Sequence, residues 1–292
     1  MIRQKKPTEE TVLKISFQAK ETIECPVCST EFHREELLSG SGRLIAGGLT
    51  DELHRLYEPS AKYGRLYPLA YIATVCPNCW FASMEADFLK IPEIKLDKAI
   101  KEEDARRTEA NMIREGVNFY NSRDLSAGII SQFLVLRCYD YYTPNFSPTI
   151  KQALAAMRTG WLLDDLNEIE KGQNYDWLAV LFKKKARFFY NQALKKEQTG
   201  KEALSALTNL GPDTDKNYGY EGLLYMNGLL EFKYGDTNDA EKRKENLSDA
   251  KRTLAKMFGM GKSSKSKPGP LMEKSRALYD EFSKALGEID DG

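Results

Sequence analysis

The sequence lacks the segments that mark a membrane or exported protein. No stretch approaches the roughly eighteen consecutive apolar residues of a membrane-spanning helix, and the start MIRQKKPTEETVLKISF has no apolar core of a signal peptide. An excess of charge is missing too, since Lys plus Arg and Asp plus Glu both number 43. Composition alone therefore offers no strongly basic face to nucleic acid. We expect a cytoplasmic protein without membrane insertion.

Catalytic motifs are also missing, and histidine is scarce. The chain contains 2 His and no G-x-S-x-G, P-loop, Rossmann or H-E-x-x-H motif. Acid–base catalysis by the usual residue therefore has few candidates. Adjacent carboxylates such as Asp164–Asp165 and Glu35–Glu36 are present, but neighbouring side chains point apart, and a solvated face explains them better. We do not expect an enzyme.

Cysteine is rare, but four of its 5 copies form two Cys-Pro-x-Cys pairs, in ECPVCSTEF and VCPNCWFAS. In a reducing compartment such pairs indicate metal ligands before disulfides. Each Cys-x-x-Cys turn places two thiolates on one ion, and two turns complete the tetrahedral shell of zinc. Iron takes the same ligands, and abundance favours zinc. We predict one zinc ion bound by the following four residues: Cys25, Cys28, Cys76 and Cys79.

Other interpretations of these pairs fit less well. A redox-active dithiol needs its C-x-x-C between a strand and a helix of a βαβ unit, a pattern this sequence lacks. A catalytic zinc keeps an open position, whereas four thiolates fill the shell and make water activation poor. A structural site is therefore expected. His33 or His54 could add a ligand, although an ordinary polar histidine is the commoner outcome, and Cys138 reads as a small core residue.

The N-terminal part differs in texture from the rest of the chain. We assign residues 1–90 to a zinc-ribbon-like module with short strands, expected at Val12–Phe17 and Tyr67–Val75, and with an inserted excursion over residues 38–66. The excursion is too long for a hairpin turn and too Gly-rich for one helix. It is expected to be mostly irregular, with a short helical stretch at Thr50–Tyr57.

Residues 91–292 read as helices separated by turn-forming residues, with no strands between them. This pattern predicts a mainly α protein whose second domain is a tetratricopeptide-like array of antiparallel helix hairpins. In the second helix, apolar residues at three- and four-residue spacings predict one buried face. The expected helices are Leu96–Tyr120, Asp124–Tyr142, Ser147–Lys171, Asn174–Lys196, Lys201–Leu210, Lys216–Tyr234, Asp239–Met260 and Leu271–Leu286.

An aromatic cluster lies around the second helix. Core packing explains most of it, but tyrosines also line the concave grooves in which helical repeats hold peptides. The cluster comprises Phe119, Tyr120, Tyr139, Tyr141, Tyr142 and Phe146. Near the C-terminus, GKSSKSKPG is expected to be a solvated linker.

The two cysteine motifs, with TDELHRLYEPS and RLYPLAYIATV between them, resemble the DUF2225 family of bacterial proteins. The resemblance implies a duplicated CPxC metal knuckle joined to a tetratricopeptide-like helical region, and it implies no particular activity. In the usual knuckle Gly follows the second Cys of each pair, whereas this chain has Ser29 and Trp80 there. Because Gly serves a backbone with positive φ, these knuckles could be strained, and Trp80 is predicted to pack the knuckle onto the helical body.

Three functions follow from these features. The first is a non-enzymatic scaffold, in which a zinc module supports a helical surface that binds another protein. The second is nucleic-acid binding through the excursion. Its candidate residues are Arg43, Arg55, Tyr57, Lys62, Tyr63, Arg65 and Tyr67. The third, a thiol-dependent enzyme, is the least favoured because it requires one reactive cysteine.

Overall fold

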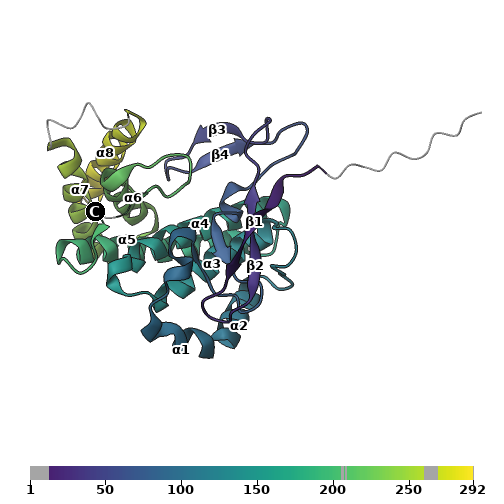
Figure 1. The fold of residues 1–292 in the computed structure, drawn as a ribbon. Coiled ribbons are helices and arrows are strands. Elements are labelled where there is room, and N and C mark those ends of the chain that lie inside the picture. The colour runs from purple at the N-terminus through teal and green to yellow at the C-terminus, as the bar shows by residue number, and fades with distance from the viewer. Residues whose placement is uncertain (1–12, 205–206, 208, 260–268, 292) are drawn as a thin grey trace, which may run out of the picture.

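The computed structural model describes residues 13–204, 207, 209–259 and 269–291. It is mainly helical, with three short strand hairpins before the first α-helix. Figure 1 shows the labelled strands β1 to β4 beside the helices. The strands are Ser16–Glu24 (β1), Glu31–Leu37 (β2), Ile45–Leu49 (β3), Arg55–Glu58 (β4), Ala73–Val75 (β5) and Ala82–Met84 (β6). The α-helices are Glu93–Lys101 (α1), Glu103–Ile113 (α2), Leu125–Cys138 (α3), Pro148–Ile169 (α4), Tyr175–Gln198 (α5), Gly219–Tyr234 (α6), Ala240–Gly259 (α7) and Gly269–Asp291 (α8).

Each pair of strands forms its own antiparallel two-stranded sheet. In β5–β6 the register places Val75 opposite Ala82, and in β1–β2 it places Glu24 opposite Glu31. Isolated hairpins of this size are marginal in water, so each one needs packing against another element. The cysteine motifs lie at the turns of β1–β2 and β5–β6, which leaves β3–β4 as the hairpin of the excursion.

The excursion corrects one sequence-based expectation. Thr50–Tyr57 is not helical, because the chain reverses there and enters β4. The amide of Thr50 donates to the carbonyl of His54 at 2.9 Å, and Leu53 adopts a left-handed φ of 59°. This turn brings the neighbouring Glu52 and Leu53 into the protein interior. Tertiary contacts thus decide the conformation of a segment whose local pattern suggested a helix.

Among the described residues of Lys201–Leu210, no α-helix forms, so this predicted helix was wrong there. The segment serves instead to complete the start of α4. The buried carboxylate of Glu202 accepts hydrogen bonds from the amide of Thr149 at 3.0 Å and from its hydroxyl at 2.8 Å. Such a contact satisfies one of the orphan donors at a helix N-terminus.

The other predicted helix and strand boundaries agree with the structure to differing degrees. The helix predicted at Leu96–Tyr120 is divided into α1 and α2 and ends at Ile113. The strand predicted at Tyr67–Val75 is reduced to β5, because Pro68–Ala70 forms a turn of 3-10 helix. The helix predicted from Asp124 begins as α3 one residue later, where the Asp124 carboxylate caps it by accepting from the Ala127 amide at 2.7 Å.

Helices α3 and α4 form the centre of the molecule. Nearly all residues of α3 are buried, so the single buried face predicted for this helix was an underestimate. Strand β6 and the 3-10 turn Pro68–Ala70 contact α3 on one side, while α4 covers another side. A helix that is apolar all round is expected in such a central position. The β5–β6 hairpin is therefore held directly against the helical body.

From α3 onward each helix packs against the next one in sequence, and α6 also contacts α8. Figure 1 shows α6, α7 and α8 gathered at one end of the molecule, away from α1 and α2. The buried core includes residues from Cys25 to Phe282 and so continues across residue 90. The division into domains at residues 1–90 and 91–292 stays a prediction, as does the tetratricopeptide-like geometry.

No helix within the described residues is long and apolar enough to cross a membrane. The predicted linker GKSSKSKPG lies almost entirely outside the described residues, as does Val12 of the first predicted strand.

Gly128 provides a test of the central packing. A methyl group on Gly128 would lie 2.5 Å from Cβ of Ala70, whereas one on Gly228 of α6 would meet no atom closer than 3.6 Å. We expect Gly128→Ala to lower the free energy of unfolding by about 1–3 kcal/mol through overpacking. Gly228→Ala should raise it by up to about 1 kcal/mol, because Ala favours helix.

Urea denaturation followed by circular dichroism measures both changes. Stabilisation by Gly128→Ala would contradict the close approach of α3 to the 3-10 turn.

Candidate functional site: a four-cysteine metal centre

The two cysteine motifs form equivalent turns. In the first, the amide of Cys25 donates to the carbonyl of Thr30, and the amide of Ser29 donates to the carbonyl of Cys25, both at 2.9 Å. In the second, Cys76 and Trp80 make the same two contacts, at 2.9 Å to Phe81 and at 3.0 Å to Cys76. The structure thus repeats one knuckle at the ends of two different hairpins.

Ser29 and Trp80 both adopt the left-handed conformation, with φ of 55° and 58°. This is the conformation for which Gly is favoured, so the knuckles keep the usual shape and accept the strain of a side chain. Trp80 offsets that strain by packing. Its ring is 6% exposed, meets Phe119 edge-on at 5.4 Å and lies 5.0 Å from the guanidinium of Arg107 on α2. The prediction that Trp80 joins the knuckle to the helical body is confirmed.

The knuckles bring four sulfur atoms together. The sulfurs of Cys25 and Cys79 are 3.6 Å apart and those of Cys28 and Cys76 are 3.5 Å apart. All four lie within 4.8 Å of one another, and all are free thiols. In a tetrahedral zinc shell with bonds near 2.3 Å, neighbouring sulfurs are separated by about 3.8 Å. The four cysteines are therefore clustered closely enough to hold one metal ion.

The protonation behaviour of the cluster fits a bound cation. Hydrogen bonds to Cys25 and Cys76, together with burial, raise the pKa of Cys79 well above its usual range. The same hydrogen bonding lowers the pKa of Cys76 to about 2 and raises that of Cys25 to about 12. The protein alone thus favours the thiolate of Cys76 and keeps Cys25 and Cys79 protonated. Ionising these buried thiols together requires a cation between them.

Polar groups join the two knuckles around the sulfurs. The amide nitrogen of Asn78 lies 3.0 Å from the hydroxyl of Thr30 and 3.6 Å from the sulfur of Cys28. The Cys28 sulfur is also 3.3 Å from the Thr30 hydroxyl. These contacts orient the one ligand of the four that is not fully buried. Such outer contacts fix ligand orientation in metal sites.

A buried arginine lies behind the second knuckle. Arg106 on α2 is completely buried and donates to the carbonyl of Cys79 at 3.0 Å, to that of Ala99 at 2.5 Å and to the Tyr141 hydroxyl at 3.1 Å. Its acceptors are two backbone carbonyls and a hydroxyl, no carboxylate in the described chain forms an ion pair with it, and its Nε has no hydrogen-bond partner. A buried cation normally requires a compensating charge.

A metal ion held by the four cysteines would supply such a charge. A divalent ion bound by four thiolates carries a net negative charge, and Arg106 contacts the backbone carbonyl of one of these cysteines, Cys79. The arginine also ties α1, α2 and the second knuckle together through its three acceptors. The chemistry of the donor set and the guanidinium charge that lacks an ion-pair partner therefore both fit a metal tetrathiolate.

Neither histidine joins the sulfur cluster. The ring of His33 contacts the carbonyl of Ala19 at 2.8 Å on the exposed side of β1–β2. The fifth cysteine, Cys138, is fully buried in α3, and burial raises the pKa of its thiol to about 11. Its expected role as a core residue agrees with this position.

The paired carboxylates lie on a solvated face only in part, since the side chains of Asp164 and Glu36 are 45% and 35% exposed while Asp165 is 14% exposed and Glu35 is buried. Glu35 is buried, with its carboxylate accepting from the Ser16 hydroxyl at 2.5 Å and from the Arg123 amide at 2.8 Å. Asp164 and Asp165 both line a cleft beneath the β3–β4 hairpin, where they pair with Lys183 and Arg65, respectively. Tertiary contacts to distant cations, which local spacing does not reveal, account for the difference.

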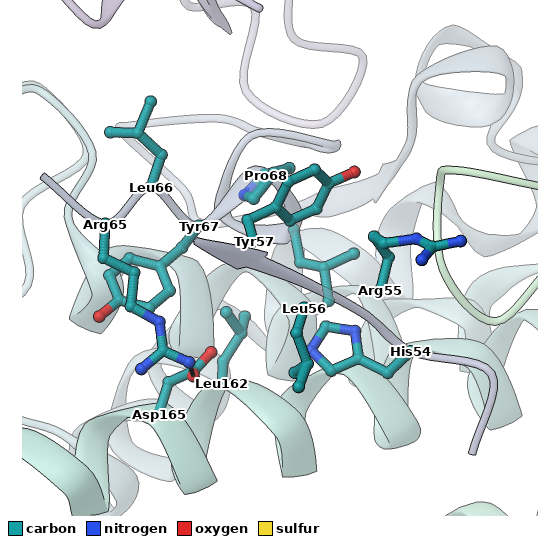
Figure 2. Close-up of a pocket in the computed structure, with 11 residues that line it drawn as sticks. His54, Arg55, Leu56, Tyr57, Arg65, Leu66, Tyr67, Pro68, Leu162 and Asp165 are labelled. Carbon is teal, nitrogen blue, oxygen red and sulfur yellow. Dashed lines mark ion pairs between the residues drawn. The ribbon is translucent and has the colours of Figure 1, made fainter. Parts of the chain in front are cut away.

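Figure 2 shows Arg65 and Asp165 facing each other at one end of the pocket under β4, with His54 at the other end. The His54 ring stacks on Trp161 with centroids 4.2 Å apart, and its Nδ1 lies 2.6 Å from Oδ2 of Asp213. His54 therefore serves to attach the hairpin to α4 and to the segment before α6. At the other end of the pocket, burial raises the pKa of Asp165 to about 6, although Arg65 and His54 favour its ionised form.

Glu52 is the centre of a second buried network at this cleft. Its carboxylate accepts hydrogen bonds from the indole of Trp161 and the hydroxyl of Tyr234, both at 2.7 Å, and lies 3.4 Å from the ammonium of Lys233. These contacts join the excursion to α4 and α6. The charged groups of the cleft are thus paired with one another and hold the hairpin in place.

Sequence patterns did not identify Arg106, Glu52 or Asp213 as important residues. Each is a charged residue in a polar stretch, which ordinarily indicates a solvated position. For Arg106 the one available signal is its position four residues before Ala110, which places both residues on the same face of α2, and Ala110 is buried. That signal is too weak to distinguish a buried arginine from an exposed one.

The fold and the sulfur cluster define a class of mainly helical proteins in which two Cys-Pro-x-Cys hairpin turns face each other across a candidate metal site. The chain belongs to the family described as "Uncharacterized protein conserved in bacteria (DUF2225)", which matches residues 18–282. The motif-based resemblance to this family is therefore confirmed. No solved structure matches the chain.

The chain is also similar to an uncharacterized protein of Borreliella burgdorferi. The two are 43% identical over 277 residues, which cover 94% of this chain and 99% of that protein. The similarity extends well past the cysteine motifs into the helical region.

Loss of one ligand tests the metal centre. Cys76→Ser should abolish stoichiometric metal binding and lower the free energy of unfolding by more than about 4 kcal/mol, because metal binding contributes to folding. Inductively coupled plasma mass spectrometry and urea denaturation measure the two effects. Cys138→Ala is the matched control and should keep one metal ion per chain. Unchanged metal content in Cys76→Ser would contradict the site.

Replacement of Arg106 tests the charge compensation. Arg106→Met should weaken metal affinity by about 10–100-fold, as loss of outer contacts does in other metal sites. Arg106→Lys keeps the positive charge and should lose less metal affinity. Competition with a chromophoric chelator measures the affinity. Arg107→Met, on the same helix but stacked on Trp80, should leave affinity nearly unchanged. Equal losses in the Arg106 and Arg107 variants would refute the compensating role.

Proposed function

We propose that this chain is a non-enzymatic binding protein, in which a structural zinc ion supports a helical region that holds a protein partner. The observation that carries the proposal is the sulfur cluster itself. Four cysteines from two knuckles surround one point, three of them are buried, and a four-thiolate shell leaves no open position for a substrate. Zinc is preferred over iron on abundance, since both accept these ligands.

The helical region supports the binding role. Consecutive helices from α3 to α8 pack against one another, as they do in tetratricopeptide-like arrays, which use extended surfaces to bind peptides and proteins. We propose this array geometry for the chain. Reduced thiols also suit a cytoplasmic location, which remains part of the proposal.

The aromatic cluster is not the proposed binding surface. Tyr139, Tyr141 and Tyr142 are buried, and hydrogen bonds hold the first and last of them to Asp87. Tyr120 is exposed, but it lies on a turn apart from these three. Helix packing therefore accounts for most of the cluster.

The two alternative functions receive less support. Two of the four cations proposed for nucleic-acid binding are paired with carboxylates, Arg55 with Asp215 and Arg65 with Asp165. A third, Arg43, donates to backbone carbonyls and stacks on Tyr63. A phosphate would have to compete with these partners. A thiol enzyme needs an accessible low-pKa cysteine outside the metal cluster, and Cys138 is buried with a raised pKa.

Partner capture tests the proposal. The metal-loaded full chain, cross-linked in bacterial cells that encode it, should recover the same protein in stoichiometric amounts, and Cys76→Ser, which cannot hold the metal, should lose it. Binding of labelled single- and double-stranded DNA and RNA is measured in parallel at low salt. Recovery of no protein partner, or tight salt-sensitive nucleic-acid binding, would refute a protein-binding function.

A further inference from the structure

The outer face of α5 carries large apolar side chains that nothing in the described structure covers. Trp177 is 63% exposed, Phe188 54% and Leu181 38%. With about 100° of rotation per residue, these three lie in one strip, opposite the buried Ala179, Phe182, Ala186 and Tyr190. A helix face that points straight to solvent normally carries polar residues. The strip therefore differs from an ordinary solvated surface.

This concentration is specific to α5. Together with Val180, the helix holds four exposed large apolar residues, and no other element within the described ranges holds more than two. Single exposed apolar residues need no explanation, whereas a contiguous group indicates an interaction surface.

The spacing along the strip indicates the shape of the occupant. Trp177, Leu181, Lys184, Phe188, Asn191 and Lys195 alternate at intervals of four and three residues. This alternation keeps one row facing a neighbouring helix over several turns. The apolar part from Trp177 to Phe188 extends over about 16 Å at 1.5 Å per residue. Lys184 lies within this row, and apolar lipid offers its ammonium no partner whereas a partner helix can offer a carboxylate, so a helical occupant is favoured.

The charges along the strip indicate its chemistry. From Trp177 to Lys195 the sequence contains no Asp or Glu, although the whole chain has equal numbers of acidic and basic residues. Lys183 and Arg187 point inward and pair with Asp164 and Glu231, respectively. By contrast, three lysines on or beside the strip are exposed and form no ion pair with described residues: Lys184, Lys185 and Lys195.

A second copy of the chain fits this surface poorly. If two α5 strips met around a twofold axis, Lys184 and Lys185 of one copy would lie near the same lysines of the other. Like charges at such positions destabilise helix pairs. A partner with acidic residues beside its apolar row satisfies both the spacing and the charge.

We propose that the outer face of α5, centred on Trp177, Leu181, Lys184 and Phe188, is the docking site for an acidic amphipathic helix of a partner protein. This inference rests on the proposed binding function and assigns it a surface and a partner chemistry. Binding buries the three apolar side chains in the partner's row and pairs the exposed lysines with its carboxylates.

Two synthetic peptides test the inference against the metal-loaded full chain. Both form amphipathic helices with the same Leu and Ile row and no Trp; one has Glu at the flanking positions and the other has Lys. Among the 3 Trp of the chain, Trp80 and Trp161 are buried, so Trp177 reports binding through a blue shift of its fluorescence. The Glu peptide should bind saturably and at least about tenfold more tightly than the Lys peptide, with weakening by salt. Absence of binding, or equal binding of both peptides, would overturn the inference.

Variants locate the binding site. Leu181→Glu and Phe188→Ser should each lower the affinity for the Glu peptide by about tenfold or more. Lys184→Glu should shift the binding preference toward the Lys peptide. Ile94→Glu, at an exposed apolar position of α1, is the matched control and should change nothing. All four residues face solvent, so thermal melting should stay near that of the parent chain. An equal loss of affinity for the Glu peptide in Ile94→Glu would overturn the assignment of the binding site to α5.

Other occupants are separated by two further measurements. Binding to phosphatidylglycerol–phosphatidylethanolamine vesicles that is lost in Leu181→Glu would show a lipid surface instead. Concentration-dependent dimerisation that is lost in Leu181→Glu would show a second copy instead. If cross-linked cells still yield a specific partner with Leu181→Glu, the α5 inference fails while the proposed binding function stands.

Discussion

The contact between the second cysteine knuckle and the helical body is the constraint on which the rest of the structure depends. Strands β5 and β6 have three residues each and pack against α3, a helix that is buried along nearly its whole length. A metal ion shared with the first knuckle would fix the β1–β2 hairpin to this same point. Short hairpins have little stability alone, so their order follows from the sulfur cluster and from its attachment to α2 and α3.

That attachment also explains the buried charge beside the cluster. Arg106 donates to backbone carbonyls of α1 and of the second knuckle, and no described acid neutralises it. A metal tetrathiolate at the cluster would supply the missing negative charge, and the arginine would in turn favour the ionised ligands. The β3–β4 hairpin is held differently, by a network of carboxylates, lysines and aromatic rings around Glu52 and His54. Two separate interactions thus secure the three hairpins.

The sequence predicted those features whose cause is local. The Cys-Pro-x-Cys spacing identified four cysteines that do come together, and the absent glycines identified Ser29 and Trp80 as left-handed residues. Most helices were also predicted, since their apolar spacing and turn residues are local signals. The helical stretch predicted at Thr50–Tyr57 and the helix predicted after α5, in its described residues, were wrong because distant groups determine these conformations. Glu52 hydrogen-bonds to Trp161 of α4, and Glu202 completes the start of that helix. Charged residues that become buried have no local signature.

The most direct test of the central claim is hydrogen exchange of the full chain with and without a zinc chelator, read by mass spectrometry. If the metal centre holds the knuckles and the helical core together, removal of the ion should expose amides in β1–β2 and β5–β6, and also in α2 and α3. Protection in α2 and α3 that is unchanged after complete loss of the metal would contradict the account, because the centre would then stabilise the hairpins alone.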